Sequence, residues 1–269
     1  MKARSNFLFH AYMAIFLAYM LLPLIVMGGA AFNDSRFPSV YPWVGWTDRW
    51  FVDLWEDGRM WVSFRNTVLV ALAVVAMSVP IGTAAAILIN SVGGPIRSVL
   101  YGFMIAPILT PGAVIGISTL LFWNKFSVPA GLHLSAIGQT SYIAAFVMLL
   151  VLARLQSFDR ALEEAALDLG ASHAQVVRRI LLPHLYPAIG AGAAVAFFQS
   201  VENFNTTLFT RGTYDTLTVY VFSRVRSGIT PTINALALIM VTLTIIGALW
   251  YEISRRRAVR RLALRPAPA

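Results

Sequence analysis

The sequence predicts an all-α membrane protein with six transmembrane helices, and three observations support this fold class. Hydrophobic residues make up 58% of the 269 residues and charged residues only 12%, against about a quarter in soluble domains. The mean hydropathy is +0.70. The apolar residues are gathered into long runs, and each run exceeds the roughly 20 residues needed to cross a bilayer. Because backbone groups in lipid must be hydrogen-bonded within the chain, runs of this length predict helices rather than barrel strands.

The whole chain, residues 1–269, is expected to form a single transmembrane domain. Lys2 and Arg4 before the first run resemble the start of a secretory signal. Its apolar part is longer than the usual signal core of about 7–15 residues, so we expect an uncleaved span. Pro107 and Pro111 predict a bent third span that lines a cavity, with a plain structural kink as the alternative. The six expected spans are residues 7–32, 66–90, 98–123, 138–156, 184–208 and 231–253.

The distribution of basic residues predicts that both termini lie in the cytoplasm. In that orientation, thirteen of the 21 Lys and Arg residues fall inside, as the positive-inside tendency requires. The net charge of +9 then reflects topology and attraction to anionic lipid headgroups. A basic tail that binds nucleic acid is the alternative, but no folded basic domain accompanies the tail, so we expect no nucleic acid partner. The chain has no cysteine and its four histidines lack a paired-ligand spacing, so no metal site is expected.

A tryptophan-rich segment, residues 33–61, is expected to connect the first two spans on the outer side. Tryptophan concentrates at membrane interfaces because its ring is apolar while its N–H seeks water or headgroups. The segment is therefore either an interfacial belt or a docking surface over an outer entrance. Its five tryptophans are Trp43, Trp46, Trp50, Trp55 and Trp61.

A polar hairpin, residues 159–183, interrupts the apolar sequence between the fourth and fifth spans. Asp159 is expected to cap a first short helix, and Gly170 to end it. Ser172 and Gln175 form a capping-box pattern that starts a second helix, which Pro183 constrains. Leu162, Ala165, Ala166 and Leu169 share one face of the first helix. A charged hairpin with an apolar seam favours binding to a partner protein, and a helix lying on the lipid surface is the alternative.

The hairpin resembles a known signature. Glu164-Ala165-Ala166, three residues, Gly170, nine residues and then Ile180-x-Leu182-Pro183 is similar to the cytoplasmic motif of permease subunits of binding-protein-dependent ABC importers. This resemblance implies the type I ABC importer permease fold, with the hairpin as a cytoplasmic coupling helix that inserts into a groove of a separate ATPase subunit. The residues to which it assigns ATPase coupling are Glu163, Glu164, Ala165, Ala166, Asp168, Gly170, Ala171, Ile180, Leu182 and Pro183.

The residues themselves also indicate that ATP is hydrolysed elsewhere. A phosphate-binding loop needs Gly-x-x-x-x-Gly-Lys-Ser/Thr, and neither of the two lysines, Lys2 and Lys125, lies in that context. We therefore expect a transport subunit with no cofactor of its own, and ATP with Mg²⁺ on the partner ATPase. The resemblance further implies two ATPase subunits, a second homologous permease that is more often a different chain than a copy, a periplasmic solute-binding protein, and a location in the bacterial inner membrane.

A polar segment after the hairpin is the candidate solute pathway. Glu202 lies near the end of a span, and a carboxylate at full membrane depth costs about 2.5–3.5 kcal/mol on insertion scales. A capping role, or an ion pair with Arg211 or Arg224, is the alternative. The candidate pathway residues are Ser200, Glu202, Asn203, Asn205, Thr206, Pro111 and Gly112.

This segment resembles the shorter permease of spermidine/putrescine-type importers. Those proteins carry two adjacent acids in the stretch after the serine, which reads Ser200-Val201-Glu202-Asn203 in this chain, and some carry an acid after the proline where this chain has Pro111-Gly112. The resemblance implies a polyamine-like solute, and because this chain has fewer acids than those proteins, another small cationic or zwitterionic amine is also expected. Other solutes remain open, namely an amino acid, a betaine, an aminophosphonate, a metal or an oxyanion. A membrane-embedded enzyme and a passive channel are the alternatives from other classes. Against the enzyme, the sequence has no nucleophile motif and no histidine near Glu202. Against the channel, it has no filter signature.

Overall fold

The computed structural model describes residues 2–159 and 161–263, and they are helical almost throughout. One isolated β-bridge, between Asn33 and Trp46, is found in this part of the chain. The helices group into two compact units, Met1–Gly58 with Val221–Ala269, and Arg59–Tyr220. Five helical segments are long and apolar enough to cross a membrane, or six if the bent pair α4 and α5 forms one span.

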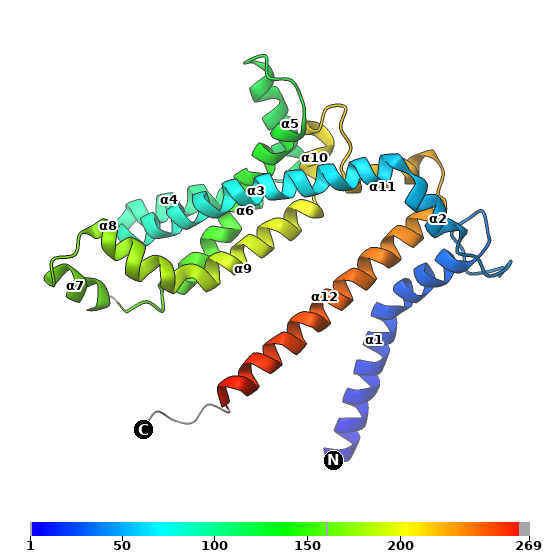
Figure 1. The fold of residues 1–269 in the computed structure, drawn as a ribbon, viewed down its shortest axis with the longest axis horizontal. Coiled ribbons are helices and arrows are strands. Elements are labelled where there is room, and N and C mark those ends of the chain that lie inside the picture. The colour runs from blue at the N-terminus through cyan, green and yellow to red at the C-terminus, as the bar shows by residue number, and fades with distance from the viewer. Residues whose placement is uncertain (1, 160, 264–269) are drawn as a thin grey trace. The chain divides into compact units, whose positions relative to one another are not determined.

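The first unit contains two long helices, α1 (Lys2–Phe32) and α12 (Thr232–Ala263), which pack against each other. A short helix, α2 (Arg49–Glu56), also packs on α12. Figure 1 shows α1 in blue and α12 in orange to red. An ion pair joins Asp57 and Arg224 within this unit.

Asn33 organises the segment that follows α1. Its Nδ2 donates to the carbonyls of Ser39 (2.9 Å) and Pro42 (3.1 Å), and its Oδ1 accepts from the Val44 N–H (2.8 Å). The indole N–H of Trp50 donates to the Asn33 carbonyl at 2.9 Å. Trp50 is therefore a buried structural residue, whereas the other four tryptophans of the segment, Trp43, Trp46, Trp55 and Trp61, are exposed.

The second unit is built around α6 (Leu132–Leu155). Helices α4 (Gly94–Leu109), α5 (Gly112–Asn124), α9 (Leu182–Val201) and α10 (Asn205–Thr210) pack on it. Helix α3 (Gly58–Ser91) approaches α6 closely at Gly82, where a Cβ would lie 2.5 Å from the Ala144 carbonyl oxygen. The core of this unit is apolar, and it is fully buried at Ile143, Val147 and Met148 of α6. Helix α11 (Leu217–Ser227) leads from this unit into the first.

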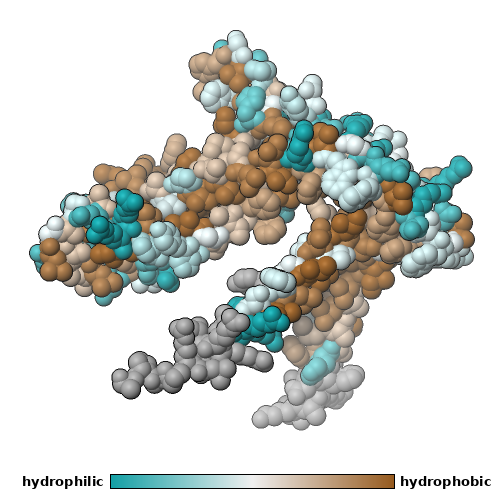
Figure 2. Space-filling model, in the orientation of Figure 1, coloured by the Kyte–Doolittle hydropathy of each residue, from teal (hydrophilic) through white to brown (hydrophobic). Residues whose placement is uncertain are grey.

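The remaining elements of the second unit form the hairpin: α7 (Ala161–Asp168), α8 (His173–Val176) and a π-helical turn, η1 (Val177–Leu181). Hydrophilic side chains gather at the end of the unit where α7 and α8 lie, while the body of the unit is mostly apolar on the visible face (Figure 2). This contrast separates a polar end from the membrane-spanning part.

The structure differs most from the expected spans in two places. Elsewhere only the helix limits differ, since α3 begins at Gly58 instead of residue 66 and α6 at Leu132 instead of residue 138. The third span, expected at 98–123, is broken into α4 and α5 with a bend of 102°. The fifth span, expected at 184–208, ends earlier, at Val201. At its N-terminal end it is continuous with the second helix of the hairpin, so that one helical segment runs from His173 to Val201. Pro183 has no N–H for the carbonyl four residues earlier, and the chain widens into η1 instead of stopping, with the Leu182 N–H bonded to the Val177 carbonyl.

Candidate functional site

A cavity of about 430 Å³ lies in the second unit where the α4–α5 break meets α6 and the link between α9 and α10. Four of the predicted pathway residues line it: Gly112, Glu202, Asn203 and Asn205. The other lining residues are Pro107, Ile108, Thr110, Ile115, Tyr142, Phe146, Gln199 and Phe204.

Two interruptions in the helices create this cavity. The residue before a proline is disfavoured in the helical region, and Thr110 is accordingly extended, with ψ 130°, so that α4 ends and α5 starts after Pro111. Helix α9 ends at Val201, and Glu202, Asn203 and Phe204 form the short link before α10. Polar backbone and side chains are thereby exposed within an otherwise apolar bundle.

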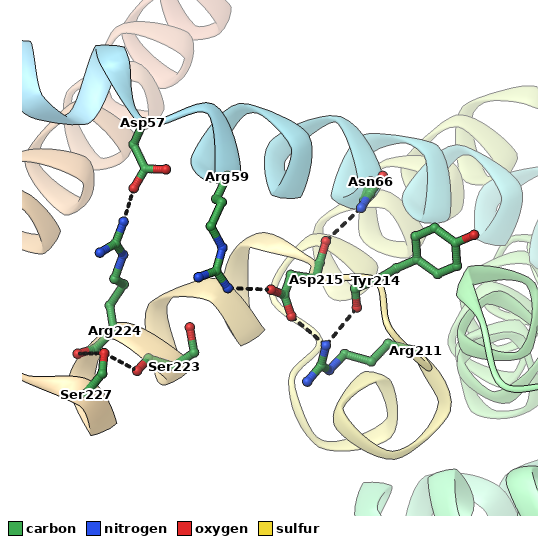
Figure 3. A network of polar contacts seen from close by, with 9 residues as sticks. All are labelled: Asp57, Arg59, Asn66, Arg211, Tyr214, Asp215, Ser223, Arg224 and Ser227. Atoms are coloured by element: carbon green, nitrogen blue, oxygen red, sulfur yellow. Dashed lines mark hydrogen bonds and ion pairs between the residues drawn. The ribbon is translucent and has the colours of Figure 1, made fainter.

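Glu202 is exposed and lines the cavity. Among the described residues, its carboxylate has no hydrogen bond or ion pair. The two arginines considered as partners pair elsewhere. Arg211 lies 2.5 Å from Asp215, and Arg224 pairs with Asp57 (Figure 3). The alternative, an ion pair of Glu202 with one of these arginines, is therefore not found among the described residues, and a carboxylate near each arginine already balances its charge.

A chain of hydrogen bonds holds the cavity wall. The Ser200 hydroxyl donates to Gln139 Oε1 (2.5 Å), and Gln139 Nε2 donates to the Thr207 hydroxyl (2.8 Å). Thr207 in turn donates to Asn203 Oδ1 (3.0 Å), and Asn203 Nδ2 donates to the Tyr142 hydroxyl (2.5 Å). Ser200, Gln139 and Thr207 are buried. These hydrogen bonds therefore fix Asn203 and Tyr142 at the cavity from inside the protein.

Three predicted pathway residues lie beside the cavity and have structural contacts. Ser200 belongs to the hydrogen-bond chain, Pro111 precedes α5, and Thr206 is fully buried and donates to the Gly112 carbonyl at 3.1 Å. Gly116 permits the close approach of α10 to α5, since a Cβ there would lie 2.8 Å from the Thr206 carbonyl oxygen. The predicted set thus divides into residues that line the cavity and residues that position them.

The link after α10 is anchored to α3 by polar contacts. Asp215 accepts from Arg211 and from Arg59, the latter at 3.3 Å, and its backbone carbonyl accepts from Asn66 Nδ2 at 2.9 Å (Figure 3). The Leu217 N–H donates to the Thr67 hydroxyl at 2.7 Å. These contacts fix the C-terminal end of the segment that carries Asn205 and Thr206.

The local signals of the hairpin are confirmed. Asp159 Oδ1 accepts from the Ala161 N–H at 3.0 Å, which caps α7. Gly170 has φ +84° and ends the helix in a Schellman arrangement, with its own N–H bonded to the Leu167 carbonyl and that of Ala171 to the Ala166 carbonyl. Both bonds of the capping box between Ser172 and Gln175 are present. The turn is therefore specified by its own residues.

The hairpin presents charged and apolar side chains together. Leu162 is 54% exposed and Leu169 is 89% exposed. The three acids of α7 make no ion pair with any described residue. Glu164, Ala165 and Asp168 are exposed, and Glu163 and Ala166 are half-buried. Ile180 and Leu182 are half-buried and Pro183 is exposed at η1 and the start of α9.

Several lining residues were missed by the sequence reasoning. Tyr142 and Phe146 stand four residues apart in α6, so they share a helix face, but in an apolar span such a pair resembles ordinary core. Gln199 could have been found from the sequence, because it adds an amide side chain to the polar end of α9. Among the residues that the structure describes, no group of three or more His, Asp or Glu side chains could hold a metal ion.

Comparisons with known proteins found similar sequences and structures over most of the chain. A family model described as the binding-protein-dependent transport system inner membrane component matches residues 78–260. The chain is 32% identical over 252 residues to the putrescine transport system permease protein PotI of Escherichia coli strain K12, covering 90% of this chain and 89% of that protein. It is 28% identical over 236 residues to the spermidine/putrescine transport system permease protein PotC of the same strain, covering 87% and 89%.

Solved structures with the same fold include two ABC transporters. A chain of a bacterial alginate ABC transporter, in complex with an alginate-bound periplasmic protein, aligns with a TM-score of 0.71 at 17% identity, covering 95% of this chain and 96% of that one. A chain of the MetNI methionine transporter aligns with a TM-score of 0.59 at 19% identity, covering 76% and 99%. With the matching family model, these findings show that the chain belongs to the family of binding-protein-dependent transport system inner membrane components, the permease subunits of type I ABC importers.

Proposed function

We propose that this permease subunit forms half of the translocation pathway for a polyamine-like or other small cationic or zwitterionic amine, and that the cavity at Glu202 is its solute site. The observation that carries the proposal is the Glu202 carboxylate, which has no cation partner among the described residues and faces a cavity of about 430 Å³.

The cavity has the chemistry that recognises an ammonium group. A carboxylate supplies the opposite charge and a charge-assisted hydrogen bond. The side-chain oxygens of Gln199 and Asn205 are further acceptors, whereas Asn203 Oδ1 already accepts from the hydroxyl and the N–H of Thr207. Aromatic rings attract cations through their electron-rich faces, and Tyr142 and Phe146 belong to the lining. No Lys, Arg or His is among the described lining residues, which argues against an oxyanion as the solute.

The names of the relatives support an amine. PotI is a putrescine permease and PotC a spermidine/putrescine permease. This cavity supplies one carboxylate from this chain, which balances one ammonium group, so a second ammonium of a polyamine needs an acid from the other half of the pathway. A monocation or a zwitterion needs no such partner.

The hairpin is proposed to couple this site to ATP hydrolysis. The exposed Leu162 and Leu169 beside the unpaired acids of α7 suit a groove in an ATPase subunit. We infer an assembly of two ATPase subunits, this permease, a second and different permease, and a periplasmic solute-binding protein, in the bacterial inner membrane with both termini in the cytoplasm. Closure of the ATPases then drives the pathway between its two states, because they bind the hairpin differently in each state.

The proposed solute site is tested by Glu202→Gln in the assembled transporter. Losing a charged partner costs about 1.5–3 kcal/mol, so uptake of the amine at sub-saturating concentration should fall by roughly 10- to 100-fold. The matched control is Glu56→Gln, the same substitution at an exposed acid of α2. Uptake is measured in proteoliposomes with putrescine, spermidine, betaine, an amino acid and an aminophosphonate. Unchanged uptake of every transported amine by Glu202→Gln would refute the assignment of the site.

A further inference from the structure

A second cavity, of about 490 Å³, lies in the same unit between the start of α4 and the end of α6. Helix α4 contributes Arg97, Ser98 and Tyr101 to its lining. The last turns of α6 and the residue after it contribute Leu149, Leu152, Ala153 and Gln156. Helices α4 and α6 pack against each other, so the cavity is a hollow between the ends of two adjoining helices.

The charge of this cavity is positive. Arg97 is its one charged lining residue, and among the described residues its guanidinium makes no ion pair or hydrogen bond. Arg97 stands in the first turn of α4, where the helix dipole opposes a cation, so helix stability does not explain it. The cavity therefore favours an anion, the opposite of the preference expected at Glu202.

The polarity of the lining changes with depth. Arg97 and Gln156 lie at the ends of their helices, where a membrane-spanning helix reaches the headgroup region. Leu149 and Leu152 lie one to two turns further in, about 5–10 Å deeper. A phospholipid has the same order, with a phosphate above and acyl chains below. This match holds whichever side of the membrane the helix ends face.

We propose that this cavity binds an anionic phospholipid. The Arg97 guanidinium pairs with the phosphate, which it can contact through two N–H groups at once. Ser98, Tyr101 and Gln156 donate hydrogen bonds to the phosphate and ester oxygens. The acyl chains lie on Leu149, Leu152 and Ala153. Basic pockets between transmembrane helices bind acidic headgroups by the same chemistry.

The test measures lipid retention by the purified, assembled transporter. Complexes carrying the wild-type chain are exchanged into detergent with phosphatidylglycerol or with phosphatidylcholine of the same acyl chains, and bound lipid is counted by native mass spectrometry. The variants are Arg97→Gln, which removes the charge, Arg97→Lys, which keeps it, and Ala153→Trp, which fills the cavity. The control is Arg36→Gln, which removes an exposed arginine from the segment after α1.

The wild type, Arg36→Gln and Arg97→Lys are expected to retain phosphatidylglycerol over phosphatidylcholine, whose choline group the guanidinium repels. Arg97→Gln should weaken phosphatidylglycerol binding about fivefold, as expected for one basic residue at a membrane surface, and Ala153→Trp should abolish it. Wild-type retention by Arg97→Gln would overturn the proposal. Displacement of the lipid by inorganic phosphate would assign the cavity to a free anion instead, and displacement by the transported amine would assign it to the solute route.

Discussion

Gln139 connects two helices that form the wall of the solute cavity, and it does so from a buried position. Its side chain bonds Ser200 of α9 and Thr207 of α10. Replacing it with leucine leaves the Ser200 hydroxyl buried without its partner, which costs about 1–3 kcal/mol. We expect Gln139→Leu to lower the stability of the permease by that amount in thermal unfolding of the purified complex. Uptake should also fall, because Thr207, which bonds Asn203, loses its own bond to α6.

A double variant separates this explanation from a simple packing defect. In Gln139→Leu with Ser200→Ala, both partners of the hydrogen bond between Gln139 and Ser200 are replaced by apolar side chains, so most of the lost stability should return. Ser141→Ala, which removes an outward-facing hydroxyl bonded only within its own helix at 2.7 Å, should be close to neutral. If the double variant is as unstable as Gln139→Leu, the hydrogen bond is not the cause.

Some residues of the cavity wall could be predicted from the sequence and others could not, for a physical reason. Glu202 and Asn203 were detectable because a charge and an amide near the end of an apolar span are costly without a role. Gln139 and Tyr142 lie inside an apolar span, where a polar residue has as many candidate partners as there are neighbouring helices. Only the packing of α6 against α9 and α10 shows which partners they have.

At the scale of elements, Gly170 is the residue on which the shape of the hairpin depends. Its φ of +84° lies in the left-handed region, which costs about 1–2 kcal/mol for most residues and more for a β-branched one. Gly170→Val should therefore distort the turn, leave membrane insertion intact and uncouple uptake from ATP hydrolysis. Asparagine tolerates this conformation, so Gly170→Asn is the matched control and should keep most of the uptake. Normal uptake in Gly170→Val would contradict the coupling role of the hairpin.

Gly116 controls how closely α5 and α10 pack at the cavity. A methyl group there would meet the backbone of Thr206 at 2.8 Å and 3.1 Å, and a backbone cannot rotate away. Gly116→Ala should destabilise the permease by about 1–3 kcal/mol in thermal unfolding and reduce uptake. Gly102 of α4 has nothing within 4 Å of such a methyl group, so Gly102→Ala should be neutral or slightly stabilising. Equal effects of the two substitutions would show that the α5–α10 contact does not matter.

The elements differ in how far sequence could predict them. The caps of α7 and α8 follow from bonds between residues two to five positions apart, so local patterns predicted them. The bend of 102° after α4 has a local cause in Pro111, which predicted a kink, but its size depends on how α5 packs on α10. In the same way Pro183 suggested a constraint, whereas the structure continues the helix through η1 into α9, which packs on α6.

At the scale of the whole molecule, the remaining prediction is the topology. The segment after α1 and the hairpin should face opposite sides of the membrane, with the hairpin in the cytoplasm. The chain has no cysteine, so single substitutions report position without background. Arg36 and Ala174 are both exposed, and their substitution with cysteine removes no hydrogen bond or ion pair found among the described residues.

A membrane-impermeant maleimide should label Arg36→Cys in spheroplasts and fail to label Ala174→Cys until the membrane is opened or inverted. The reason is the distribution of charge, since basic residues near the ends of spans resist translocation to the outer side. In this topology Arg36 lies in the first outer segment and Ala174 in the loop after the fourth span, so an odd number of membrane crossings separates them. Labelling of Ala174→Cys from outside would place the hairpin away from any cytoplasmic ATPase, and the coupling proposal would then be wrong.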